Sequence, residues 1–291
     1  MNGTLGGQDA QPARPRRFAD FRLRLASALV LGPLALAAIW FGSPWFALLV
    51  GVASAILAWE WVHLCGLRLR ALPGTAVGAS LLAASICAGF HLWQAALAAL
   101  ALGTVLAWLL VERIALTEAQ HRAAVWLAAG VVYIGLAAVG LVWLRADSAA
   151  GRANVLFVVL VVWASDIGAY LAGRLVGGPR LAPRISPNKT WAGAGGGLAS
   201  ALVVGLASAW LLAGLGSVLL AAAIALVVGA ASQAGDLFES WMKRRFMVKD
   251  SSRLIPGHGG LLDRADGLIA AAPVAALLSL ATGQGRVLWL T

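Results

Sequence analysis

One polar segment separates two long apolar ones and decides the fold: residues 240–266, SWMKRRFMVKDSSRLIPGHGGLLDRAD, lie between apolar runs at 215–235 and 266–282. Apolar runs of about 20 residues are long enough to cross a bilayer as helices. The polar segment holds nine charged residues and a histidine, which are Lys243, Arg244, Arg245, Lys249, Asp250, Arg253, His258, Asp263, Arg264 and Asp266. Cations and carboxylates gathered at helix ends in this way are typical of a site for a polyphosphate held through a metal ion.

The rest of the chain has the composition of a membrane protein. Of its 291 residues, 61% are hydrophobic and 12% are charged, whereas a soluble domain carries about 25% charged residues. We therefore expect an all-α, polytopic integral membrane protein with about nine transmembrane helices. The apolar runs are 25–41, 44–59, 74–92, 94–111, 124–144, 154–177, 190–213, 215–235 and 266–282. The second and ninth are close to the minimum of ~17 residues, so tilted or re-entrant helices are alternatives there.

The basic residues are distributed unevenly around these runs. Lys and Arg stay on the cytoplasmic side of membrane proteins, and nine spans with a cytoplasmic N-terminus place 19 of the 22 on that side, all except Arg145, Arg152 and Arg286. This predicts that residues 240–266 face the cytoplasm and that Thr291 lies outside. The net charge of +10 then favours anionic phospholipid headgroups and nucleotide phosphates. A nucleic-acid partner is not expected, because no basic soluble module accompanies the spans.

Two parts of the chain are expected to differ in order. Residues 1–24 are rich in Gly, Pro and Arg, and we expect them to form a disordered basic cytoplasmic tail rather than a signal peptide. Residues 25–291 are expected to form a single transmembrane domain that carries the site. Cys65 and Cys87 fall at or within helices, so we expect buried thiols rather than a disulfide or a metal pair.

Polar residues after the eighth apolar run share one face of a helix. Asp236, Glu239, Ser240 and Lys243 are spaced i, i+3, i+4 and i+7, so a helix that continues through them presents all four on one side. A solvated helix end with an ordinary Glu–Lys pair is the alternative. Asp236 directly follows apolar residues, and a carboxylate at membrane depth costs about 3 kcal/mol unless it has a partner. This favours a polar site.

The last run opens with two carboxylates. Asp263 and Asp266 lie at a helix start, where the helix dipole favours negative charge, so capping alone would explain one of them. Together with Asp236 they would offer hard oxygen ligands for Mg²⁺. Gly259 and Gly260 allow backbone N–H groups to approach an anion, although a plain tight turn is equally compatible with them.

A second polar group lies upstream. Asp166 is well inside the sixth run, where an ionisable residue marks a polar cavity unless it only forms a helix-packing hydrogen bond. The loop 184–191, RISPNKTW, offers two cations and two hydroxyls just before a helix. This suits phosphate binding through Ser186, Lys189 and Thr190 at a helix N-terminus, with a simple helix-start signal as the alternative.

Three other features are expected to be structural or to have no role. The glycines at 193 and 195–197 lie within an apolar run and favour close helix packing over a nucleotide-binding loop. Glu60, between two tryptophans, is expected at the membrane interface and receives no role. His258 is the only histidine inside a charged cluster, and taken alone it is more typical of a structural hydrogen bond than of catalysis.

A dozen positions of the polar segment have a spacing that resembles a known signature: Ser240, Lys243, Arg244, Lys249, Asp250, Pro256, His258, Gly259, Gly260, Asp263, Arg264 and Asp266. This is similar to the signature of the phosphatidate cytidylyltransferases, also called CDP-diacylglycerol synthases. Residues 186–193, SPNKTWAG, resemble the same family's second box, Ser-Pro-Lys-Lys-Thr-Trp-Glu-Gly, from which Asn188 and Ala192 depart. The resemblance covers roughly residues 160–282.

The resemblance implies transfer of a cytidylyl group from CTP to phosphatidic acid, which forms CDP-diacylglycerol and releases pyrophosphate. It also implies Mg²⁺ as the cofactor, with Asp236, Asp263 and Asp266 as metal ligands. CTP, phosphatidic acid and membrane phospholipids are the expected partners, and a homodimer is compatible with them. The expected location is a bacterial cytoplasmic (inner) membrane, with the active site facing the cytoplasm.

Roles for single residues follow from the resemblance and the chemistry together. The residues expected to take part in catalysis are Asp236, Lys243, Asp250, His258, Asp263 and Asp266. Those expected to bind substrate are Asp166, Ser186, Lys189, Thr190, Ser240, Arg244, Lys249 and Arg264.

Two other classes of protein share some of these features. A secondary transporter also places ionisable residues in the membrane, but near the midplane and often between repeated halves; here the charges gather at one face. A CTP-dependent polyprenol or lipid kinase is closer in chemistry and differs in which phosphate is attacked. Transfer of label from α-labelled CTP to lipid separates the kinase from a cytidylyltransferase.

Overall fold

The structure is a computed structural model that describes residues 17–66, 72–113, 117–146, 150–213, 216–252, 254, 259–282 and 286–290, with side chains from residue 29 onward except at 119 and 120. These residues form nine helices and a two-stranded hairpin. In chain order they are α1 (Arg17–Phe41), α2 (Trp45–Leu64), α3 (Leu72–Gly89), α4 (Trp93–Glu112), α5 (Glu118–Arg145), α6 (Ala150–Leu175), β1 (Arg180–Ala182), β2 (Ser186–Thr190), α7 (Trp191–Ala213), α8 (Val218–Arg245) and α9 (Leu262–Thr282).

The predicted helical membrane fold is confirmed. Eight helices, α2 to α9, are long and apolar enough to cross a membrane, and α1 adds a shorter apolar stretch, Leu29–Phe41. α8 continues unbroken from its apolar part to Arg245, as the spacing of its carboxylates requires. The hairpin is the one departure from an all-α fold in the described chain, because the segment expected to be a loop forms β2, antiparallel to β1.

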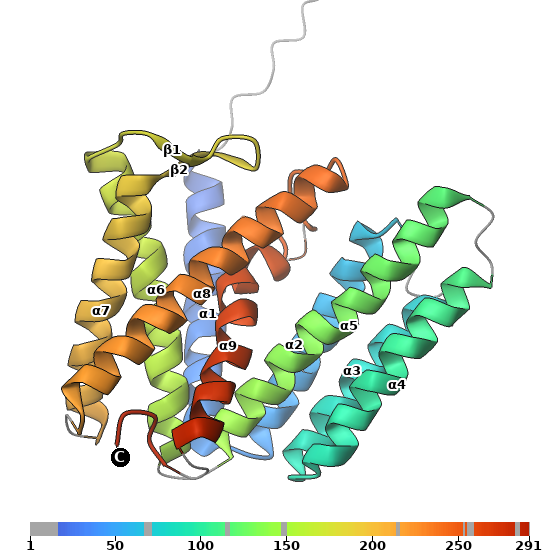
Figure 1. Ribbon diagram of the computed structural model, residues 1–291, viewed down its shortest axis with the longest axis horizontal. Helices are drawn as coiled ribbons and strands as arrows, with labels where there is room; N and C mark the ends of the chain where they lie inside the picture. The colour runs from blue at the N-terminus through green and yellow to red at the C-terminus, as the bar shows by residue number, and fades with distance from the viewer. Residues whose placement is uncertain are drawn as a thin grey trace, which may run out of the picture.

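The helices form two groups that meet at α9 (Figure 1). α2 to α5 pack together on one side, and α6 to α8 lie on the other. α9 stands between them and contacts α2, α5, α6 and α8, while α1 contacts α2 and α6. Residues at the start of α9 are therefore close to both groups.

The two ends of the bundle differ in what they carry (Figure 1). One end, called here the site end, holds the start of α1, the β1–β2 hairpin, the end of α8 and the start of α9. The C-terminus lies at the opposite end. The odd number of crossings stays a prediction, because eight helices have the length and apolarity of a membrane span and α1 adds only a shorter apolar stretch. Large exposed apolar side chains, such as Val203, Leu219 and Leu277, suit the sides of the bundle to contact with lipid.

Close helix packing explains most of the glycine run at the start of α7. A Cβ added to Gly196 would lie 2.2 Å from the Cβ of Ala172, and one added to Gly197 would lie 2.8 Å from the Ser165 carbonyl oxygen. The predicted packing role is thus confirmed at these positions. Gly195 is different, since nothing lies within 4 Å of the space its Cβ would fill.

Polar groups at the end opposite the site are matched by backbone groups. Arg145, 4% exposed, donates from Nε to the Ile39 carbonyl at 2.6 Å and from Nη2 to the Trp40 carbonyl at 3.1 Å. Asn154 donates to the Arg286 carbonyl and accepts from the Leu288 N–H. The C-terminal residues 286–290 are therefore folded back onto α6.

The two cysteines do not pair. Cys65 is buried and Cys87 is half-buried, and both are free thiols. Burial raises the pKa of the Cys65 thiol to about 12, so it stays protonated at neutral pH. The predicted buried thiol is confirmed for Cys65.

Candidate active site

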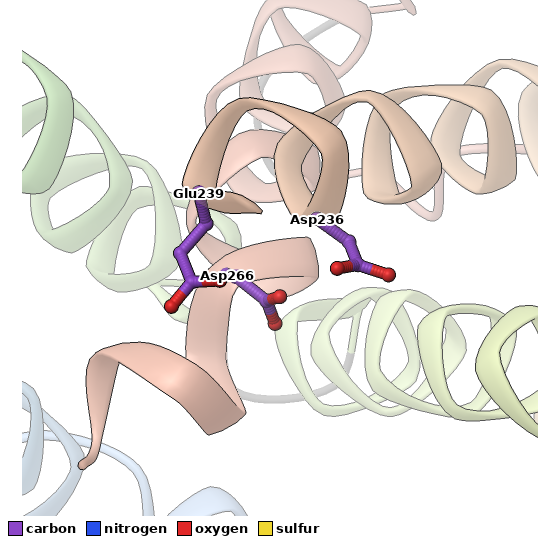
Figure 2. Close-up of side chains that lie close together, drawn as sticks. All are labelled: Asp236, Glu239 and Asp266. Atoms are coloured by element: carbon purple, nitrogen blue, oxygen red, sulfur yellow. The ribbon is translucent and has the colours of Figure 1, made fainter. Parts of the chain in front are cut away.

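Three carboxylates from α8 and α9 converge at the site end, and we call them the ligand cluster: Asp236, Glu239 and Asp266. Each can offer one oxygen such that the three oxygens lie within 4.8 Å of one another. Figure 2 shows Asp236 and Glu239 extending from α8 toward Asp266 on α9. Glu239 is 3% exposed, and its Oε1 has no hydrogen-bond partner among the described residues. A buried carboxylate oxygen without a partner is costly.

Two glycines bring α8 and α9 into backbone contact at this point. A Cβ on Gly235 would lie 2.5 Å from the Asp266 carbonyl oxygen, and one on Gly267 would lie 2.5 Å from Ser232 Oγ. Only residues without a side chain fit such a close approach. The contact sets the carboxylate-bearing faces of the two helices against each other.

The ligand cluster fits a hard divalent cation. Three carboxylates this close repel one another unless protons or a cation intervene. Oxygen ligands in this number, with room for phosphate oxygens, are what magnesium-type sites use. A cation would also give the unpaired Glu239 Oε1 a partner.

Two lysines already neutralise part of this negative charge. Lys189 on β2 pairs with Asp236 at 2.5 Å. Lys243 bridges the two helices, with its Nζ 2.6 Å from Glu239 Oε2 and 2.9 Å from Asp263 Oδ1. Lys189, predicted to bind phosphate, and Lys243, predicted to take part in catalysis, therefore both contact carboxylates in this structure.

Asp263 has a different environment from the one expected. Its side chain is 8% exposed, and its oxygens accept from the Ser251 N–H at 3.1 Å, the Ser251 hydroxyl at 3.0 Å and the Gly260 N–H at 2.9 Å. With Lys243 added, its acceptor sites are largely used. The structure brings Glu239 rather than Asp263 into the ligand cluster, so the role of Asp263 as a metal ligand stays a prediction that these contacts do not favour.

A cleft of about 540 Å³ opens beside the ligand cluster. It is formed by α6, the hairpin, the start of α7 and α8, and its lining residues are Asp166, Ala169, Tyr170, Gly173, Arg174, Leu181, Ser186, Asn188, Lys189, Thr190, Gly193, Ala194, Gln233, Asp236 and Leu237. Asp236 belongs both to the cleft and to the ligand cluster. The two sequence regions singled out as polar, around Asp166 and around Asp236, thus line one space.

The hairpin positions the predicted phosphate-binding residues over this cleft. Arg180 of β1 pairs with Thr190 of β2, and Thr190 Oγ1 accepts from the Gly193 N–H at 3.0 Å, which caps the start of α7. Arg244 at the end of α8 donates to the Ile185 carbonyl at 3.4 Å and links α8 to the hairpin turn. The strand geometry brings Lys189 toward Asp236.

Other predicted site residues lie outside both features. Within the described chain, the ligand cluster and the cleft lining do not include Ser240, Arg244, Lys249, Asp250 or Arg264. Lys249 and Asp250 are exposed in the loop after α8. His258 lies outside the described residues, so its expected role stays a prediction.

Glu60 is the residue whose environment differs most from expectation. It is fully buried, and its carboxylate accepts hydrogen bonds from residues near the start of α9. The expected depth at the membrane interface stays a prediction, whereas burial inside the protein with these hydrogen bonds was not expected. A signal was present in the sequence, because Glu60 is the sole charged residue of the apolar helix α2, and a carboxylate in such a helix marks a buried partner.

Several known proteins are similar to this chain in sequence. The cytidylyltransferase family matches residues 22–281. A phosphatidate cytidylyltransferase of Brucella suis biovar 1 (strain 1330) is 41% identical over 253 residues, which cover 87% of this chain and 91% of the relative. One from Pseudomonas aeruginosa is 40% identical over 269 residues, covering 90% and 98%. One from Staphylococcus aureus (strain COL) is 40% identical over 148 residues, covering 51% and 56%.

Proposed function

This chain belongs to the cytidylyltransferase family, and from that premise we propose that the ligand cluster and the adjoining cleft are its active site. Its activity is that of a phosphatidate cytidylyltransferase, a nucleotidyltransferase of CDP-diacylglycerol synthesis. The substrates are CTP and phosphatidate. A phosphate oxygen of phosphatidate forms a bond to the α-phosphorus of CTP, the bond from that phosphorus to the β-bridging oxygen breaks, and pyrophosphate leaves.

Asp236, Glu239 and Asp266 would hold a divalent cation, and Mg²⁺ is the ion whose chemistry fits best. When bound, it supplies charge neutralisation for the phosphates and for the departing pyrophosphate. The observation that carries this assignment is the unpaired, buried Oε1 of Glu239 beside two further carboxylates.

The cleft would hold the phosphates beside that cation. Lys189, Ser186 and Thr190 line it from the hairpin, and Lys189 reaches Asp236. A lysine paired with a metal-binding carboxylate becomes free to contact a phosphate once the cation takes its place. Asp166, also in the lining, faces the same space and would orient a substrate group. Catalysis then consists of holding two polyanions in register and neutralising their charge.

The protein would sit in a bacterial cytoplasmic membrane with the site end facing the cytoplasm, where CTP is present. Support comes from the eight apolar helices and from the bacterial relatives. The excess of basic residues on that side agrees with the same orientation. A homodimer and the roles of Lys249, Asp250 and Arg264 stay predictions.

Direct metal binding tests the proposed site. Purified protein is titrated with Mn²⁺ as a paramagnetic substitute, and bound ion is measured by electron paramagnetic resonance. We expect one Mg²⁺-competable site in the parent and its loss in Asp236→Asn/Asp266→Asn. Unchanged Mn²⁺ binding in the double variant would contradict the assignment. In parallel, α-labelled CTP should label the lipid and γ-labelled CTP should not; the reverse would indicate a lipid kinase.

A further inference from the structure

We infer that Glu60 of α2 is a positioning residue for the active site, because it holds the start of α9 and the preceding loop in place from the other half of the bundle. It belongs to neither the ligand cluster nor the cleft lining. This inference rests on the proposed role of Asp236, Glu239 and Asp266.

Glu60 acts as the cap of a helix to which it does not belong. Its Oε1 accepts from the Leu261 N–H at 2.8 Å and its Oε2 from the Leu262 N–H at 2.6 Å. These N–H groups open α9, where a helix has no backbone acceptors of its own. A side-chain carboxylate is the acceptor that such donors favour. The first turn of α9 is thus fixed to α2 by two short, charge-assisted hydrogen bonds.

The same carboxylate also fixes the loop before α9. Ser252 Oγ donates to Glu60 Oε1 at 2.6 Å, and Ser251 Oγ lies 3.4 Å from Oε2. A Cβ on Gly260 would lie 2.7 Å from Glu60 Oε1, so this glycine lets the backbone close over the carboxylate. Both sides of the loop are therefore tied to one buried group.

These contacts continue to the ligand cluster in two short steps. Ser251 and Gly260, held next to Glu60, donate to Asp263, and Asp263 holds Lys243 against Glu239. Asp266 follows Asp263 by one turn of the same helix. Glu60 therefore sets both the rotation of α9 and the position of the lysine that neutralises Glu239.

Glutamine at this position would replace one hydrogen-bond acceptor of Glu60 with a donor, without changing the size of the side chain. An amide offers one acceptor oxygen, and its nitrogen is a donor. Whichever way the amide turns, its NH₂ faces a backbone N–H that needs an acceptor, and a buried donor stays unpaired. The loop and the start of α9 should loosen while the rest of the bundle keeps its packing.

The experiment compares Glu60→Gln and Glu60→Asp with a matched control, Glu118→Gln. Glu118 is also a helical glutamate but is 92% exposed and pairs with Arg122 on its own helix. Steady-state kinetics are measured well below the melting temperature of each variant. For Glu60→Gln we expect kcat to fall at least about tenfold and the Mg²⁺ concentration for half-maximal activity to rise about fivefold, with KM for CTP within about twofold. Glu60→Asp should recover part of kcat, and Glu118→Gln should match the parent.

A readout other than activity follows the loop itself. Lys249 is exposed in this loop, so limited trypsin digestion followed by mass spectrometry reports its order. Glu60→Gln should be cut after Lys249 faster than the parent. If Glu60→Gln does not fold, Ser252→Ala decides: it removes one contact to Glu60 and should raise cleavage and lower kcat a few-fold.

Two outcomes separate this inference from the proposed site. Parent-like kcat, Mg²⁺ dependence and cleavage in the folded Glu60 variants, or in Ser252→Ala, would overturn the positioning role while an inactive Asp266→Asn still supports the site. An active Asp266→Asn would overturn the site itself. A lower melting temperature of Glu60→Gln with unchanged kcat and Mg²⁺ dependence would reduce Glu60 to a purely structural residue.

Discussion

Two groups of carboxylates meet near the start of α9, and the protein surrounds them in opposite ways. The anchored pair, Glu60 and Asp263, accepts hydrogen bonds from backbone N–H groups and serine hydroxyls. The ligand cluster is formed by Asp236, Glu239 and Asp266, of which Asp266 follows Asp263 by one turn of α9. One buried oxygen of this cluster has no partner among the described residues. The carboxylates of the anchored pair already have their hydrogen-bond partners within the protein. The ligand cluster has the oxygens that could hold a cation.

The difference shows how to tell a structural carboxylate from a functional one when both are buried. Satisfied acceptors hold a backbone in place and leave little to attract a ligand. Closely spaced carboxylates repel one another, and a bound cation reduces this repulsion and gives an unused oxygen a partner. By this criterion the contacts of Asp263, which was expected among the metal ligands, resemble those of Glu60, and its role as a ligand stays a prediction.

The largest effect should come from removing charge from the ligand cluster. Asp236→Asn and Asp266→Asn should each lower kcat at least about a hundredfold, or ~2.7 kcal/mol of barrier, because the cation that neutralises the phosphates is lost. Glu60→Gln is the comparison from the anchored pair and should lose less. Kinetics in detergent with saturating Mg²⁺ measure this, and circular dichroism checks the fold. More than about a tenth of parental activity in Asp266→Asn would erase the distinction between the two groups.

A smaller effect should come from pushing the two helices apart. Gly235→Ala places a Cβ against the Asp266 carbonyl and against the Cβ of Ala270, and such overpacking costs about 1–3 kcal/mol of stability. It should also lower kcat, because the carboxylates of α8 and α9 separate. Gly195→Ala is the matched control, since its Cβ enters open space and alanine favours a helix. Equal melting temperatures for the two variants would show that the close approach is dispensable.

The smallest expected effect concerns Lys189, the basic residue at the edge of the ligand cluster. Lys189→Ala should lower kcat/KM for CTP or phosphatidate about tenfold, or ~1.4 kcal/mol, with expression unchanged. Arg113, exposed at the end of α4, is the control for general surface charge, and Arg113→Ala should have parental kinetics. A similar loss in both variants would mean that Lys189 contributes only to the charge of the membrane surface.

Much of the fold could be predicted from the sequence, because the thickness and the apolar interior of a bilayer restrict the length and composition of the helices that cross it. Apolar runs of about 20 residues can only be helices, and α8 had to continue past residue 235 because its polar residues share one face. The hairpin was missed, since SPNKT reads as a polar loop. Its strand pairing depends on Arg180 and Ala182 in a separate segment.

The sequence indicated which polar segments contribute to the site, but it indicated less well which carboxylates form the ligand cluster. Helical spacing shows which residues share a face, but it does not show which face of a neighbour they meet. Asp263 and Asp266 are three residues apart, and only the rotation of α9 decides that Asp266 reaches the ligand cluster. That rotation depends on Glu60, which is 202 residues from its partner Leu262. A lone carboxylate in the apolar helix α2 indicates that a buried partner exists, but local sequence patterns do not identify a partner so far along the chain.

The folded-back residues at the far end of the bundle affect how the protein should be handled. Trp289 and Leu288 are fully buried, and Trp289 stacks against Phe157 of α6 with ring centres 4.6 Å apart. Ser217, at the start of α8, donates its backbone N–H to the Trp289 carbonyl. Truncation before residue 286 would remove a buried indole, a loss of the size that costs about 3–5 kcal/mol in other proteins. Affinity tags for purification are therefore better placed at the N-terminus, and shortened chains should be avoided in crystallisation trials.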